Sequence, residues 1–93
     1  MIKFEWDEKK NKLNSKKHKI WFEEAVQVFD DPTAILYRDT QHSESEDRFL
    51  LLGMSFSGRV LLVVHCERSN SVIRIISARK ATRREMSNYE EGI

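Results

Sequence analysis

The amino-acid sequence predicts an α+β protein of one domain, residues 1–93, with N-terminal helices packed on one face of an antiparallel sheet and a C-terminal helix. Three observations support this prediction. A chain of 93 residues has room for one hydrophobic core. Apolar residues recur at helical spacing before Pro32, and from Arg48 onward they follow the pattern of strands joined by short turns. Such strands pair antiparallel, and this separation of helices from strands is typical of α+β folds.

The first third of the chain predicts one strand and two helices. Residues 2–6 alternate apolar and polar side chains, as a half-buried strand does. Asp7 suits the N-cap of a lysine-rich helix that extends to about Lys17. A second helix has apolar side chains at i, i+3, i+4 and i+7 over residues 22–29, and Pro32 ends it because the residue before a proline avoids helical geometry.

The rest of the chain predicts a meander of strands and a last helix. Thr82 and Glu85 form a capping box that opens this helix, which carries Met86 and Tyr89 on one side. Strict alternation along the last strand would place Arg74 on one face of the sheet and Arg79 on the other. The predicted strands are residues 34–37, 48–56, 60–66 and 72–79, with a polar loop at 38–47 and a hairpin turn at Ser57-Gly58.

Charge is unevenly distributed along the chain, although the net charge is only +1. Residues 1–21 carry seven lysines against three acids, residues 22–47 carry eight acids against one arginine, and residues 48–93 carry eight basic groups against four acids. Folding can therefore gather a cationic face from the two ends. The alternative is that the opposite blocks simply neutralise each other across the surface.

Several classes of protein are disfavoured by composition. No apolar run approaches the roughly 18 residues needed to span a bilayer, and the N-terminus has no signal-peptide stretch. The one cysteine, Cys66, has no partner for an internal disulfide, so we expect a reduced thiol in a cytoplasmic protein. The sequence has no glycine-rich phosphate loop, no zinc-ligand spacing and no nucleophile motif, so we expect no cofactor and no metal.

Arginine and histidine near the ends of the predicted strands are what RNA cleavage without a metal requires. Such cleavage needs one group that removes the 2′-hydroxyl proton and another that protonates the leaving 5′-oxygen. Histidine can do either near neutral pH, and lysine can when its pKa is depressed. Arginine matches phosphate oxygens and stabilises the negative charge that develops on them.

Each candidate also has a structural interpretation. Lys17-His18 suits a solvated helix C-terminus, where cations interact favourably with the helix dipole. His65 lies in an apolar strand, a position that favours a core histidine. Arg48 and Arg79 begin and end strands, where surface ion pairs are common.

Short distinctive segments occur from end to end of the chain: FEWDEKK (residues 4–10), KH (17–18), FEEA (22–25), VFDDP (28–32), EDR (46–48), VVHCER (63–68) and IRIISARKAT (73–82). Through these segments the sequence resembles the BrnT toxins of type II toxin–antitoxin systems. The run at residues 73–82 is the most specific part of this resemblance. The chain departs from the family at Trp21, where relatives tend to carry a serine or aspartate able to cap the following helix.

The resemblance implies a RelE-like fold and a ribonuclease that blocks translation. It also implies inhibition by a BrnA-like ribbon-helix-helix antitoxin, through which the complex would bind operator DNA and repress its own operon; no membrane partner is expected. Transferred by matching position, the catalytic candidates are Lys17, His18, Glu46, Arg48 and Arg79. The other expected sites are Arg74, His65, Lys80 and Arg83 for RNA, and Met86 and Tyr89 for the antitoxin.

Two other functions fit the same sequence. A non-catalytic module could bind the antitoxin and tune repression, and it would leave growth unchanged when over-expressed alone. A plain RNA-binding protein would show salt-sensitive binding without cleavage products.

Overall fold

The computed structural model describes residues 1–41 and 47–93. Helices and strands follow one another in the order that the sequence predicts, with a short 3₁₀ turn after the second helix. The elements are β1 (Lys3–Glu5), α1 (Glu8–His18), α2 (Phe22–Gln27), η1 (Val28–Asp30), β2 (Ile35–Asp39), β3 (Arg48–Met54), β4 (Val60–Ser69), β5 (Val72–Lys80) and α3 (Arg83–Glu91).

The strands form one sheet in the order β1-β5-β4-β3-β2. The meander β2-β3-β4-β5 is antiparallel, as predicted from its short connections. β1 departs from the expected antiparallel sheet, because it pairs parallel with β5, Lys3 opposite Val72. β1 and β5 are distant in sequence, so no turn between them sets their relative direction. The fold class is therefore confirmed, with a mixed sheet in place of a purely antiparallel one.

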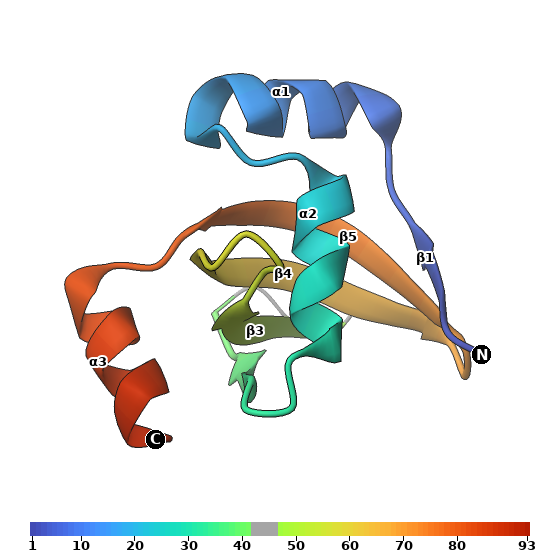
Figure 1. The fold of residues 1–93 in the computed structure, drawn as a ribbon. Coiled ribbons are helices and arrows are strands. Elements are labelled where there is room, and N and C mark those ends of the chain that lie inside the picture. The colour runs from blue at the N-terminus through green and yellow to red at the C-terminus, as the bar shows by residue number, and fades with distance from the viewer. Residues whose placement is uncertain (42–46) are drawn as a thin grey trace.

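The main core lies between the sheet and the first two helices. In Figure 1, α2 crosses the strands, α1 lies above β5, and α3 stands apart at the end where β5 leaves the sheet. Phe22, Ala25 and Val28 pack against Leu61, Val63 and other strand side chains on this face. A smaller core on the opposite face groups Leu52, Val60 and Leu62 with Tyr89 of α3. The predicted packing of the N-terminal helices on one face is confirmed.

Two buried asparagines hold α1 in place. Asn14 donates from Nδ2 to the carbonyl of Ala78 (2.9 Å) and accepts from the Ala78 N–H (3.1 Å), as a neighbouring strand would. β1 pairs with residues 72–74 of β5, and the rest of β5 lies at the edge of the sheet. Without Asn14, the Ala78 N–H and C=O at this edge would lose their hydrogen-bond partners. Asn11 accepts from the Phe22 N–H (2.7 Å) at the start of α2.

The start of α2 has no capping side chain of its own, as the departure at Trp21 suggests. Trp21 occupies the N-cap position and makes no capping bond with its side chain. The Asn11 side chain satisfies the first amide of the helix from α1 instead. At the start of α1, Asp7 accepts from the Lys9 and Lys10 amides, and Thr82 and Glu85 form the capping box of α3. These last two predictions are confirmed.

A β-bulge in β5 overturns the prediction from strict alternation. Val64 of β4 pairs with Ser77, whereas the next residue, His65, pairs with Ile75, so Ile76 is the extra residue. The bulge reverses the alternation at that point. Arg74 lies opposite Cys66 and Arg79 opposite Leu62, so both arginines lie on the same face of the sheet. The prediction that they face opposite ways was wrong.

Candidate active site

Three arginines lie on the sheet face opposite α1 and α2, which is called the arginine face below. Arg48 of β3 and Arg74 of β5 both pair with Cys66 of β4, so the three side chains form one row across the central strands. Cys66 is buried between them, and both arginines are half-buried. Arg79 lies further along β5 on the same face. The face therefore gathers cations from two strands that are distant in sequence.

A carboxylate residue lies at each end of this row. In the strand register, Asp39 of β2 is opposite Arg48, and Glu5 of β1 is opposite Arg74. The Arg74 guanidinium donates to a Glu5 oxygen at 2.9 Å. Each guanidinium carries five donors, so one carboxylate contact leaves capacity for a phosphate oxygen. The row can orient its arginines and still bind an anion.

Arg79 ties α3 to the sheet. Its two terminal nitrogens donate to the two oxygens of Glu85 at 2.8 and 3.0 Å. This hydrogen-bonded pair raises the pKa of Arg79 and lowers the pKa of Glu85, so both groups stay charged. Glu85 also accepts from the Thr82 N–H at 2.8 Å. Arg79 thus has a structural role in addition to lying on the arginine face.

The Lys17-His18 pair lines a shallow groove between α1 and β5. Lys17 and His18 lie in the last turn of α1. Lys10, nearer the start of the same helix, also lines the groove. The bulge residue Ile76 and its neighbour Ser77 form the strand side of the groove. Ser77 pairs with Val64 and therefore lies on the arginine face. The groove meets that face at the edge of β5.

Lys10 and Ser77 are the site residues that the sequence analysis missed. Lys10 lies seven residues before Lys17, a spacing that places both on one side of a helix, so the signal was present. Ser77 gave no such signal. Its place depends on the bulge, which the alternation of side chains does not reveal.

Other predicted site residues lie elsewhere. His65 is only 3% exposed, and its ring packs against Phe29 at 4.9 Å and Phe49 at 5.9 Å between ring centroids. Desolvation lowers the pKa of His65, so burial favours the neutral ring. Lys80 pairs with Leu61, a residue of the core under α2, and so faces away from Arg79. Arg83 is exposed in the first turn of α3.

The two predicted antitoxin contacts differ from each other. Met86 is 36% exposed on α3. The Tyr89 hydroxyl donates to Asp31 at 2.6 Å and lies 3.0 Å from the Thr33 hydroxyl, which fixes α3 to the segment before β2. The bond to Asp31 raises the pKa of Tyr89. The catalytic candidate Glu46 lies outside the described residues.

Within the described residues, 1–41 and 47–93, no group of three or more histidine, cysteine, aspartate or glutamate side chains is arranged to hold a metal ion. In the same residues no helix is long and apolar enough to cross a membrane. What the described groups supply is guanidinium donors for an anion, together with an amine and an imidazole at the edge of the same face.

The first two helices on one face of the sheet and three arginines on the other define a small α+β protein whose cationic face suits phosphate groups. A family model described as the ribonuclease toxin BrnT of type II toxin–antitoxin systems matches residues 6–85. The chain therefore belongs to the BrnT family of ribonuclease toxins. Such a toxin implies an RNA substrate and a cognate antitoxin.

A solved structure shows the same fold. The 1.1 Å crystal structure of the Brucella abortus ribonuclease toxin BrnT matches with a TM-score of 0.69 and 20% sequence identity, covering 89% of this chain and 100% of that chain. At this identity the likeness concerns the fold alone. No curated protein matches the chain.

Proposed function

We propose that this toxin is a metal-independent endoribonuclease that cleaves RNA through the 2′-hydroxyl. The 2′-oxygen attacks the phosphorus and the bond to the 5′-oxygen breaks, leaving a 2′,3′-cyclic phosphate and a 5′-hydroxyl. One group takes the 2′-hydroxyl proton and another protonates the 5′-oxygen. The observation that carries this proposal is the presence of Arg48, Arg74 and Arg79 on one face of the sheet, at whose edge Lys17 and His18 lie.

The arginines are assigned to the phosphate. Arg48 and Arg79 hold the scissile group and stabilise the charge that grows on its oxygens, and Arg74 contacts the adjoining RNA. Because Glu85 already occupies both terminal nitrogens of Arg79, a phosphate must share or displace that carboxylate.

Lys17 and His18 are assigned to proton transfer. His18 is half-buried and Lys17 is exposed in a groove that contains Ser77 of the arginine face. An imidazole can give or take a proton near neutral pH. Glu46, just before β3, remains a proposed base. His65 is left out of this site because its ring is covered by two phenylalanines.

The mechanism is tested by incubating the purified toxin with end-labelled RNA in excess EDTA. We expect cleavage to persist and the products to carry 2′,3′-cyclic phosphates. Loss of all cleavage in chelator would refute the metal-independent route. Wild-type cleavage rates in both His18→Ala and Arg79→Ala variants would show that these two assignments are wrong.

We further propose that cleavage inhibits translation in the cytoplasm until a BrnA-like antitoxin covers the toxin, and that the complex represses its own operon. Over-expression of the toxin alone should arrest growth, and co-expression of its antitoxin should restore it. Unchanged growth would favour the alternative of a non-catalytic, antitoxin-binding module. The ion pairs of Arg74 and Arg79 are the observation on the side of that alternative.

A further inference from the structure

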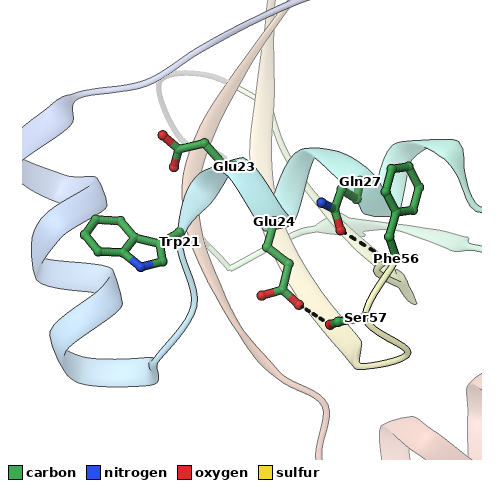
Figure 2. Close-up of a pocket in the computed structure, with 6 residues that line it drawn as sticks. All are labelled: Trp21, Glu23, Glu24, Gln27, Phe56 and Ser57. Atoms are coloured by element: carbon green, nitrogen blue, oxygen red, sulfur yellow. Dashed lines mark hydrogen bonds between the residues drawn. The ribbon is translucent and has the colours of Figure 1, made fainter.

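An open pocket lies on the helix side of the molecule, between α2 and the turn that joins β3 to β4. Figure 2 shows Trp21 at one end, Phe56 at the other, and side chains of α2 between them. Trp21 is 50% exposed and Phe56 is 73% exposed. This depression is named the Trp21–Phe56 pocket. Its lining residues are Trp21, Glu23, Glu24, Gln27, Phe56 and Ser57.

The turn that carries Phe56 is held firmly against α2. The hydroxyls of Ser55 and Ser57 donate to one oxygen of Glu24 at 2.7 and 2.9 Å, and the Arg59 guanidinium forms an ion pair with the same carboxylate. The Phe56 N–H donates to Gln27 at 2.9 Å. A chain held in this way loses little freedom on binding, so the exposed Phe56 ring is presented as a preorganised contact.

The exposed aromatic rings are not needed for the core. Neither Trp21 nor Phe56 belongs to the two clusters of buried hydrophobic residues in the described chain. A Trp at the N-cap position also leaves α2 without a side-chain cap of its own. Exposed tryptophan and aromatic neighbours in a preformed depression are typical anchors of protein–protein interfaces.

The pocket is acidic. Glu23 and Glu24 line it, and none of the six lining residues is a lysine or arginine. Arg59 offsets the charge of Glu24, whereas Glu23 is exposed. The Asn11 amide donates to both Glu23 (2.9 Å) and Glu8 (3.1 Å), so the Glu8 carboxylate lies close to that of Glu23. RNA phosphates are repelled here, and a partner that combines an apolar side chain with a lysine or arginine is favoured.

We propose that the Trp21–Phe56 pocket is a docking site for the antitoxin. A segment of the antitoxin places an apolar side chain between the Trp21 and Phe56 rings and a neighbouring lysine or arginine against Glu23. This proposal rests on the proposed function, since it takes the antitoxin to neutralise the toxin. The pocket and the arginine face lie on opposite sides of the sheet, so substitutions in the pocket should leave RNA cleavage by the free toxin unaffected.

The test measures the dissociation constant of the purified full-length toxin and its cognate antitoxin by calorimetry. Trp21→Ser and Phe56→Ser each remove an exposed ring, and serine at position 21 suits an N-cap, so both variants should fold. We expect each to raise the Kd at least about tenfold, as loss of an interface anchor does. Leu36→Ser is the matched control, because Leu36 is 57% exposed on β2 and should change the Kd less than about twofold.

The charge contact has its own test. Glu23→Gln should raise the Kd several-fold at low salt, and the difference from wild type should shrink at high salt. Thermal unfolding and the RNA cleavage rate of each variant should match wild type. A Trp21→Ser/Phe56→Ser double variant that binds the antitoxin as tightly as wild type would overturn the docking site. Failure of the free wild-type toxin to cleave RNA would instead count against the proposed function.

Discussion

The arginine face and the Trp21–Phe56 pocket differ in charge, in chemistry and in how they are built. The arginine face takes its cations from strands, and cross-strand pairing sets their spacing. The pocket takes its carboxylates from α2 and its aromatic rings from the segments beside it, and side-chain hydrogen bonds set its shape. One 93-residue chain therefore presents a surface suited to phosphate and another that repels it.

Under the proposed docking, the anchoring side chains of the antitoxin and the RNA phosphates contact different groups of the toxin, because the two surfaces have opposite charge. Variants of one surface should leave the other unaltered, and this separation can be tested.

The largest expected effect comes from the arginine face. Arg48→Ala should lower the RNA cleavage rate about 100-fold, because it removes a donor that stabilises the charge of the transition state. The measurement is single-turnover cleavage of end-labelled RNA. Arg38→Ala is the matched control, since Arg38 pairs with Phe49 on the opposite face and forms an exposed ion pair with Asp47. Equal rates in the two variants would remove Arg48 from the site.

The next effect is on stability. Asn14→Ala should lower the free energy of unfolding by about 2–3 kcal/mol, because it leaves the Ala78 N–H and C=O at the edge of β5 without their buried partner. Urea titration measures this loss. Lys12→Ala, on the exposed side of the same helix, should change stability by less than about 0.5 kcal/mol. If Asn14→Ala changes the free energy of unfolding only slightly, water must replace Asn14 as the hydrogen-bond partner of the Ala78 N–H and C=O.

A third prediction concerns pH and the pocket. The ion pair and hydrogen bond with Arg59, with the bonds from Ser55 and Ser57, hold the pKa of Glu24 at about 2 against burial. The unfolded chain, with a pKa near 4.5, binds this proton first as the pH falls. The stabilisation is therefore complete above pH 4.5 and is lost between about 4.5 and 2.

Glu24→Gln should remove this part of the acid sensitivity and cost about 1–2 kcal/mol at pH 7. Unfolding free energies of both proteins from pH 7 to pH 3 provide the measurement. Asp31 also has a pKa lowered to about 2, through bonds from Tyr89 and two backbone amides that outweigh burial, so the variant should keep some acid sensitivity. Parallel curves for the two proteins would contradict the assignment to Glu24.

The smallest expected effect is at His65. Because its ring is buried between Phe29 and Phe49, His65→Phe should leave RNA cleavage within about twofold of wild type. Burial lowers the pKa of His65, so the wild type should lose stability as the pH falls below about 6.5 and the variant should not. A large loss of cleavage without loss of stability would return His65 to the active site.

Much of the fold follows from patterns that are local in the chain. The Asp7 cap, the helical spacing before Pro32, the hairpin turn at Gly58 and the Thr82–Glu85 capping box each depend on neighbours within a few residues. Gly58 adopts a positive φ of 83°, which glycine tolerates without strain. The candidate residues were partly predictable for the same reason, since Lys17-His18 ends a helix and Arg48 begins a strand.

The sequence by itself thus determined the order of helices and strands, their main boundaries and the types of side chain available for RNA chemistry. Only the tertiary structure decided which faces those side chains share. The bulge at Ile76, the parallel pairing of β1 with β5 and the burial of Asn14 and His65 all depend on contacts between segments distant in sequence. Local periodicity contains no information on such contacts, because the register of a strand is chosen by its partner and not by its own alternation.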